Sequence, residues 1–568
     1  MSVPQRFATM VRPDLATVAG RFPVPAGAAL VAAILIVLRL DEVIPRDDGP
    51  FERALYGSAI AFTAGLASGI LLEGRGVAAI IAGQLVSLAI GVGAALSMFS
   101  LWLTPPLLLA SLALLAVAAP GFAAGGTTVR FWVLNLRSGF VALVGAVGTG
   151  AFVLGLGAIL ATLHSLFDIP VPDRLVAQAA AVSFVFLLPL YWLAFQPRVQ
   201  DLGAEEPPRD ILLRTVAALT DFIFLPLLVI YAIILHVYAA KIAISATLPR
   251  GQIGWMVSAF LSLGYLAFLL ATPRQSPLPG LRGFFRIAWP PATLVPAVLL
   301  ALALRERVQA YGVTEERYLI GIAAFAAVLL IVAWLPKRRL DPRLVPAVAA
   351  GLLLVAAVGP LSAQLVTAHS QSQRFVAMLD ASGGFSGCRS GEERPTSWSP
   401  EARSDLQSVV RVLERRRGLH LIAPHVGLPP TATARELSAC LGLERPPSPG
   451  VPPPILQSVA GYVRIGSDVL LGPFFSGMTQ MVVFRAPDGP DYTFRVEHRR
   501  AVLSGPAGTF LFDLSDEPPI ELGSHPRVVR AEDSRAVLIV RGLRWDGTDE
   551  ARTPGLLSGE ILLRGIQP

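Results

Sequence analysis

Residues 219–245 read LTDFIFLPLLVIYAIILHVYAAKIAIS, and this stretch decides the class of the protein. A helix needs about 20 mostly apolar residues to cross a bilayer, and this run is long and apolar enough to do so. Further runs of the same kind lie on both sides of it. Together they predict about eleven transmembrane helices, near residues 24–39, 55–72, 77–99, 103–120, 139–163, 175–195, 219–245, 253–271, 289–305, 317–335 and 344–366.

The composition agrees with a membrane protein. Of the 568 residues, 53% are hydrophobic and 15% are charged, and the mean hydropathy is +0.60. Soluble domains average roughly 45–50% hydrophobic and roughly 25% charged residues. The composition therefore excludes a soluble globular protein, a disordered chain and a coiled coil. Charged residues are about twice as frequent after residue 366 as before it. We therefore expect a transmembrane domain over 1–366, a small helical subdomain over 367–457 and a β-rich module over 458–568.

The expected fold is an all-α polytopic membrane bundle followed by an α+β extracytoplasmic domain. Apolar residues at helical spacing predict a helix over 399–417, and a second short helix fits 432–442. From about residue 458, short alternating runs separated by turn signals predict a sandwich-like or barrel-like module. Its strands are expected near 461–465, 478–484, 492–497, 509–514, 535–540 and 560–564.

Charges in the loops predict the orientation of the bundle. With the N-terminus in the cytoplasm, sixteen Lys and Arg residues fall in the inner loops and nine in the outer loops. This is the bias that the positive-inside rule describes. The basic cluster at 337–339 precedes the last apolar run, so the soluble part is expected outside the cytoplasm.

The net charge and the cysteines bear on partners and compartment. The formal charge of +7 lies in the membrane half, whereas the soluble half is neutral, so nucleic acid is not an expected partner. The chain has two cysteines, Cys388 and Cys440, which could pair in an oxidising compartment. A disulfide there would constrain the unfolded subdomain by roughly 4 kcal/mol in the chain-entropy model. We expect this bond, and two unrelated buried thiols are the alternative.

No motif for catalysis or metal binding is complete. The sequence contains no His-Glu-x-x-His, Gly-x-Ser-x-Gly, Walker or Cys-x-x-Cys motif. His420 and His425 are five residues apart and have no third ligand near them. The sequence therefore points to no metal, no cofactor and no catalytic residue, and it favours a protein that is not an enzyme.

Polar residues inside the run 219–245 form the first candidate binding site, because charge in lipid is costly and usually functional. Asp221 lies near its start, and Tyr231, Tyr238 and Lys241 follow. Tyr231 and Tyr238 are seven residues apart and so share a helix face. The four residues form either a polar stripe along a cavity or interfacial tyrosines with a snorkelling lysine.

The outer loop between the ninth and tenth runs is the second candidate. Thr314 can cap the helix that follows, and Glu315 is favoured in its first turn. Capping leaves Arg307, Tyr311 and Arg317 unexplained. These residues could bind a lipid or polymer phosphate, or they could dock the soluble domain.

Several stretches carry a family resemblance. They are FWVLN at 131–135, LFDIP at 166–170, LPLLVIY at 225–231, LPRG at 248–251, YGVTEERY at 311–318, and Ser370-Gln371 with Arg374. On these residues the chain resembles bacterial domain-of-unknown-function family 4153, a set of polytopic inner-membrane proteins. The resemblance covers most of residues 20–440. It implies an integral inner-membrane protein, and it assigns no activity, substrate or catalytic residue. With the loop charges, which place the soluble part outside the cytoplasm, we expect the soluble domain in the periplasm.

Three function classes follow from these observations. The first is a protein that binds a lipid, an envelope polymer or a partner protein at the extracytoplasmic membrane face, for assembly or sensing. The second is a permease that uses the polar stripe. The third is a membrane-embedded transferase with a lipid-linked donor, for which Asp168 and Glu315 are the candidate bases. The sequence does not indicate an oligomeric state. Because the matched outer loops and the soluble domain share one face, we expect the protein to work there.

Overall fold

The computed structural model describes most of the chain. The described residues are 15–45, 49–167, 172, 174–203, 211–245, 253–273, 276–381, 398–443, 458–460, 462–465, 468–476, 481–484, 492–497, 500–505, 508–515, 527–531, 535–546 and 553–563. The chain forms two compact units, residues 1–444 and 445–568. Each unit is described by itself.

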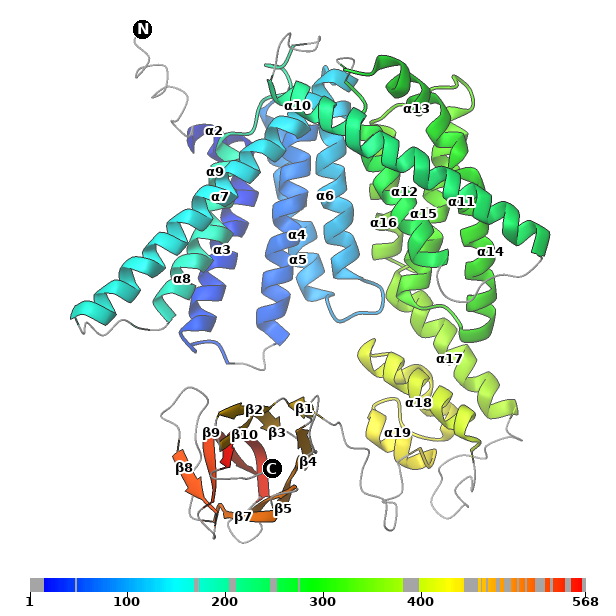
Figure 1. The fold of residues 1–568 in the computed structure, drawn as a ribbon. Coiled ribbons are helices and arrows are strands. Elements are labelled where there is room, and N and C mark those ends of the chain that lie inside the picture. The colour runs from blue at the N-terminus through cyan, green and yellow to red at the C-terminus, as the bar shows by residue number, and fades with distance from the viewer. Residues whose placement is uncertain are drawn as a thin grey trace. The chain divides into compact units, whose positions relative to one another are not determined.

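The first unit is helical (Figure 1). Its α-helices are α2 (Leu15–Arg21), α3 (Pro23–Leu40), α4 (Gly49–Leu71), α5 (Val77–Leu96), α6 (Pro105–Phe122), α7 (Thr128–Phe167), α8 (Arg174–Val182), α9 (Leu188–Ala194), α10 (Ile211–Leu219), α11 (Leu225–Ser245), α12 (Ile253–Leu270), α13 (Pro279–Ala292), α14 (Leu294–Tyr311), α15 (Glu315–Trp334), α16 (Leu344–Ala357), α17 (Ala363–Ala381), α18 (Pro400–Arg415) and α19 (Ala434–Cys440). The π turns η1 (Ser183–Leu187) and η2 (Thr220–Phe224) join α8 to α9 and α10 to α11, and η3 (Leu419–Leu421) and η4 (Ala423–Val426) are 3₁₀ turns.

Within the described residues, nine helical stretches are long and apolar enough to cross a membrane. They are Pro23–Leu40, Gly49–Leu71, Val77–Leu96, Pro105–Phe122, Thr128–Phe167, Arg174–Ala194, Ile211–Ser245, Pro279–Tyr311 and Glu315–Trp334. Two shorter apolar helices, Met256–Leu270 and Leu344–Ala357, correspond to the other expected runs. The chain is thus a multi-pass membrane protein, while the number of helices that cross stays a prediction.

The last apolar run differs from its expected form. The sequence predicted one span over 344–366, but α16 ends at Ala357 and α17 begins at Ala363. Gly359 between them has φ +84°, and Pro360 follows it. A left-handed glycine and a proline both end a helix. The expected domain boundary at 366 therefore falls inside α17.

Two other spans are longer than expected. The run expected at 139–163 belongs to α7, which has 40 residues and so a length of about 60 Å. The bilayer core is only about 30 Å thick. Figure 1 shows α7 and the continuous stretch from α10 to α11 running obliquely to helices such as α5 and α6. A strong tilt is one way in which such helices fit a membrane.

The connections between helices gather at two ends of the first unit. At the first, called the Arg21 end, the Arg21 guanidinium pairs with the Glu73 carboxylate at 2.9 Å, and both side chains are buried. Burial lowers the pKa of Arg21, and the nearby Glu73 carboxylate offsets part of this effect. At the opposite, Tyr311 end, the backbone N–H of Thr104 donates to the Ala357 carbonyl at 2.7 Å. This bond ties the start of α6 to the end of α16.

The helical subdomain at the Tyr311 end has its own apolar core. Phe375 of α17, Leu406 and Leu413 of α18, and Leu437 of α19 are fully or almost fully buried together. The two helices that the sequence predicted here, over 399–417 and 432–442, are present as α18 and α19. This core holds α17, α18 and α19 as one body.

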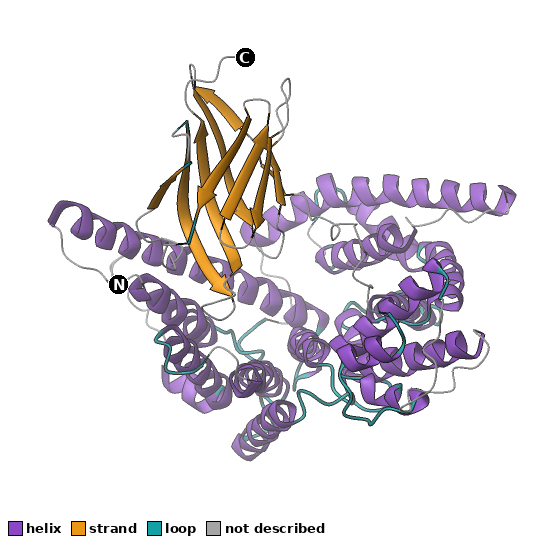
Figure 2. Cartoon of the chain, turned by 90° about the horizontal axis from the view of Figure 1, so that it is seen from below, coloured by secondary structure: helices purple, strands orange, loops and turns teal. Residues whose placement is uncertain are grey.

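The second unit is a β module (Figure 2). Its strands are β1 (Ser458–Ala460), β2 (Tyr462–Ile465), β3 (Asp468–Ser476), β4 (Met481–Phe484), β5 (Tyr492–Glu497), β6 (Arg500–Gly505), β7 (Gly508–Asp513), β8 (Arg527–Arg530), β9 (Ala536–Asp546) and β10 (Thr553–Leu563). They form two five-stranded sheets, ordered β1-β4-β5-β6-β7 and β2-β3-β10-β9-β8. Among the described strands, every neighbouring pair is antiparallel except β1 with β4, which is parallel. Both sheets contribute to one buried apolar core.

Candidate functional site

The turn between α14 and α15 is built for close packing. Gly312 has φ +70° and ψ 179°, a conformation that is essentially confined to glycine and costs other residues roughly 1–3 kcal/mol. A Cβ at Gly312 would lie 2.8 Å from the Gln371 amide nitrogen, so glycine also makes room for α17. The Thr314 hydroxyl accepts from the backbone N–H of Arg317, which is the cap that the sequence predicted.

Hydrogen bonds from α17 hold this turn. The buried Gln371 amide donates to the carbonyls of Tyr311 and Val313, at 3.1 and 3.0 Å. The Val313 N–H donates to the Ser370 hydroxyl at 2.9 Å. Side chains of α17 therefore satisfy backbone groups that a turn between two helices would otherwise leave to water.

Two arginines flank the exposed Tyr311 ring. The guanidinium carbons of Arg317 and Arg374 lie 5.5 and 5.8 Å from the ring centroid. Arg317 also donates to the Gly312 carbonyl at 2.7 Å, and Arg374 pairs with Asp405 of α18 at 2.7 Å. Arg307 is exposed. In this arrangement the guanidiniums of Arg317 and Arg374 fasten the turn and the helical subdomain.

Glu315 makes a further link to the subdomain. Its carboxylate pairs with Arg416, just beyond α18, at 2.6 Å. The sequence allowed docking of the soluble domain for Arg307, Tyr311 and Arg317. Of these, Tyr311 contacts Gln371 and Arg374 of α17, whereas the hydrogen bonds of Arg317 stay within the turn. A pocket lies beside the pair of Glu315 and Arg416.

The pocket, here called the outer arginine pocket, has a volume of about 430 Å³. It lies where membrane helices meet the helical subdomain. It is lined by Tyr56, Met98, Phe99, Thr104, Pro105, Pro106, Leu107, Glu315, Leu319, Gln364, Arg415, Arg416 and Arg417. Its volume falls in the range of pockets that bind small molecules.

Arg417 holds a strained position in this pocket. Its φ is +56°, in the left-handed region that glycine usually supplies at the end of a helix. Gly418 follows directly, so the strained position is filled by arginine although a glycine is adjacent in the chain. The strain places the Arg417 guanidinium carbon 3.8 Å from the centroid of the Phe99 ring. Non-glycine residues in this conformation cluster at functional sites.

The pocket carries uncompensated positive charge. Arg53 also lies over the Phe99 ring, at 4.5 Å from the centroid. Arg416 is paired with Glu315, whereas among the described residues no carboxylate pairs with Arg53, Arg415 or Arg417. Guanidiniums bind phosphate and carboxylate oxygens through paired N–H groups. The chemistry that this arrangement supports is the binding of an anionic group.

The first sequence candidate is not brought together as one group. Asp221 is fully buried in η2, where its carboxylate accepts from the Arg282 guanidinium at 2.6 Å. Tyr231 is half-buried, packs against Phe260 and donates to the Met256 carbonyl at 3.4 Å.

The rest of the stripe lies further along α11. Tyr238 is half-buried and packs on the core of the C-terminal helices, and Lys241 is exposed. Asp221 lies in the π turn η2, whose hydrogen bonds run from i to i+5, so its position relative to the tyrosines of α11 does not follow from α-helical spacing. Neither Asp221 nor the other three residues line the outer arginine pocket.

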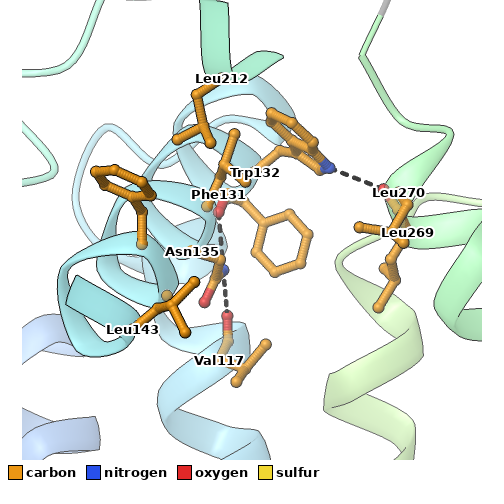
Figure 3. Close-up of a pocket in the computed structure, with 11 residues that line it drawn as sticks. Val117, Phe131, Trp132, Asn135, Leu143, Leu212, Leu269 and Leu270 are labelled. Atoms are coloured by element: carbon orange, nitrogen blue, oxygen red, sulfur yellow. Dashed lines mark hydrogen bonds between the residues drawn. The ribbon is translucent and has the colours of Figure 1, made fainter. Parts of the chain in front are cut away.

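A second pocket lies within the membrane helices and is apolar. Its volume is about 350 Å³. Figure 3 shows Trp132 of α7 donating to the Leu269 carbonyl of α12, at 2.8 Å, beside Asn135. The Asn135 amide donates to the carbonyls of Val117 and Phe131. These polar groups bond to the protein itself, so the pocket offers little beyond apolar surface.

Two residues of interest cannot be placed. Asp168 and Cys388 lie outside the described residues. Cys440 is half-buried against the subdomain core. The Cys388–Cys440 disulfide therefore stays a prediction.

Sequence reasoning missed the arginines of the pocket. The run Arg415-Arg416-Arg417-Gly418 ends the amphipathic helix α18, and a basic run closed by glycine at a helix end could have drawn attention. Arg53 and Phe99 carry no comparable signal, because only the fold brings them to α18.

Comparisons with known proteins agree with a membrane protein without an assigned role. A family model described as "Domain of unknown function (DUF4153)" matches residues 26–382. An uncharacterized protein of Pasteurella multocida (strain Pm70), PM1469, is 26% identical over 226 residues, which are 39% of this chain and 37% of that protein. The match thus spans well under half of the relative's length. No solved structure matches this chain.

Proposed function

The chain belongs to the DUF4153 family, and from that premise we propose that it binds an anionic, phosphate-bearing envelope component in the outer arginine pocket. The observation that carries the proposal is that two guanidiniums lining the pocket, those of Arg415 and Arg417, have no carboxylate partner among the described residues, while the Arg53 guanidinium lies over the Phe99 ring that also lines it. The phosphate could belong to a lipid or to an envelope polymer. Binding would serve assembly or sensing at that face.

The pocket is proposed to face the periplasm of a bacterial inner membrane. Loop charges support this orientation, since sixteen Lys and Arg residues fall on the side predicted to be cytoplasmic and nine on the other. The contacts between the α5–α6 connection and the end of α16 support it too, because both were expected outside. The N-terminus would then be cytoplasmic, and the α17–α19 subdomain and the β module periplasmic.

The two alternatives draw less support. A permease would use Asp221, Tyr231, Tyr238 and Lys241 along a cavity, but the Asp221 carboxylate is occupied by Arg282 and Ser276. A transferase would need a free base; of the two candidates, Glu315 is paired with Arg416, and Asp168 lies outside the described residues. We therefore rank a binding protein first.

Removing two pocket arginines should weaken the binding of an anionic lipid. We expect the variant Arg415→Ala/Arg417→Ala to bind phosphatidylglycerol at least tenfold more weakly, because each charge-assisted hydrogen bond contributes about 1.5–3 kcal/mol. Native mass spectrometry of the full chain in a neutral detergent measures this affinity. Phosphatidylcholine, which is zwitterionic, should bind more weakly than phosphatidylglycerol to the unchanged chain.

A matched control is available on the same helix. Arg411 is exposed on α18 and does not line the pocket, so Arg411→Ala removes one arginine charge without touching the site and is matched to the single variants Arg415→Ala and Arg417→Ala. Its affinity should equal that of the unchanged chain. Equal losses in Arg411→Ala and in the single pocket variants would mean a general charge effect, and no loss in the double variant would refute the proposal.

The orientation is tested by reporters. A phosphatase fusion after Gln373 should be active and one after Lys337 inactive, because only the periplasm lets that reporter fold with its disulfides. The Cys388–Cys440 bond belongs to the same prediction. Both thiols should resist alkylation until a reductant is added. The reverse activity pattern, or alkylation without reductant, would place the subdomain in the cytoplasm.

A further inference from the structure

The outer arginine pocket has two chemically different halves. One half presents Arg415, Arg417 and Gln364. The other presents the apolar side chains of Met98, Leu107 and Leu319, with the Tyr56 and Phe99 rings. An inorganic anion or a polymer phosphate would use only the first half. The second half matches a ligand that is itself part apolar.

The two halves lie along the direction in which the helices run. Leu319 is in the second turn of α15 and Tyr56 in the second turn of α4, both inside helices that are long and apolar enough to cross a membrane. Arg415 is the last residue of α18, which belongs to the subdomain beyond those helix ends. Arg415 is therefore outermost. The deepest part of the apolar half, formed by Leu319 and Tyr56, lies about one to two helical turns inside the ends of α15 and α4, at about 5.4 Å per turn. Met98 and Phe99 lie in the α5–α6 connection.

A bilayer lipid has the same polarity along the same direction. We infer that the occupant of the outer arginine pocket is an anionic phospholipid of the surrounding membrane, with its phosphate on Arg415 and Arg417 and the start of an acyl chain against Leu107 and Leu319. This inference rests on the proposed function and names the class of its ligand. It also gives Phe99 a position at the boundary between the halves, where Arg417 and Arg53 lie over its ring.

The inference explains why an arginine holds the strained position 417. A glycine there would end α18 without strain, but it would remove the guanidinium that lies over Phe99. Arg417→Gly should therefore leave the subdomain folded and still lose affinity for phosphatidylglycerol. That combination separates a ligand-binding role of Arg417 from a structural one.

The apolar half is tested by filling it. We expect Leu319→Trp to lower the affinity of the full chain for phosphatidylglycerol at least about tenfold, since the indole would occupy the space of the chain and stays compatible with a membrane helix. Val328→Trp is the matched control, because Val328 lies on the same helix, is 40% exposed and does not line the pocket. Native mass spectrometry in neutral detergent is the readout.

Two further probes separate a lipid from a polymer. Deacylated glycerophosphoglycerol should compete poorly with phosphatidylglycerol, and a diazirine on the acyl chain close to the glycerol should crosslink to peptides that contain Met98–Leu107 or Leu319. Full competition by the deacylated headgroup, together with unchanged binding by Leu319→Trp, would overturn the inference. If the arginine variants still lost affinity, the proposed function would survive and the ligand would be a polymer phosphate.

Discussion

Replacing Asp221 with alanine is expected to lower the free energy of unfolding by about 3–5 kcal/mol, because breaking a buried ion pair leaves one charge without a partner. The Asp221 carboxylate is fully buried and accepts from both the Nε and an Nη of Arg282, at 2.8 and 2.6 Å. It also accepts from the Leu278 N–H at 3.2 Å and from the Ser276 hydroxyl. One side chain thus joins η2 to the segment that leads into α13.

The measurement is equilibrium unfolding of the purified chain in mixed micelles. Asp221→Ala should unfold at a clearly lower denaturant fraction than the unchanged chain. The double variant Asp221→Leu/Arg282→Met should recover most of the loss, since an apolar pair of similar volume often replaces a buried ion pair without cost. A single variant as stable as the unchanged chain would show that water reaches Arg282.

Asp221 also shows which features could be predicted from the sequence and which could not. Its charge inside an apolar run was recognised, because Asp221 is conspicuous in the stretch 219–245. Its partner was not, because Arg282 is 61 residues away and lies in a stretch that the sequence predicted as a loop, where arginine is ordinary, although the structure places it in α13. The π turn that carries Asp221 leaves no pattern in the sequence either. Asp221 was therefore grouped with Tyr231, Tyr238 and Lys241 because the four residues share one apolar run.

Elements with strong local patterns were found, and those that depend on distant contacts were not. The apolar runs predicted the helices, but the break at Gly359 depends on a backbone angle, and the length of α7 includes polar turns at its start. In the β module, β5 was expected at its observed residues 492–497. β3 was not expected, because Asp468–Ser476 contains Gly472 and Pro473, which usually weaken a strand.

In the candidate site, too, the part with a local sequence pattern was predicted and the part that depends on distant contacts was not. The turn at 311–318 was singled out because arginines outside the membrane oppose the positive-inside bias. The contacts of Arg317 and Glu315 explain why those charges are held there. The pocket beside the turn depends on the docking of α18 against Phe99, which no local pattern encodes.

A second large loss of stability is expected when Gly264 of α12 is replaced by alanine. A Cβ at this position would lie 1.6 Å from an atom of the outer ring of Trp289, far closer than two carbons approach without bonding. Trp289 is 3% exposed and its ring packs against Phe260 and Phe285, at 4.7 and 5.1 Å between centroids. The indole has no free space to move into. Gly264→Ala should therefore cost at least about 3 kcal/mol, the upper part of the usual range for overpacking.

The cost should depend on the indole rather than on helix propensity. Trp289→Phe removes the atoms that the new methyl group would strike, so Gly264→Ala/Trp289→Phe should be more stable than Gly264→Ala alone, although each change by itself destabilises. Gly351→Ala in α16 is the control, because a Cβ there meets nothing within 4 Å, and it should stabilise its helix by up to about 1 kcal/mol. Unfolding in mixed micelles measures all four proteins. Equal losses for Gly264→Ala with and without the phenylalanine would mean that the contact between α12 and α13 is not as close as the Gly264–Trp289 distance requires.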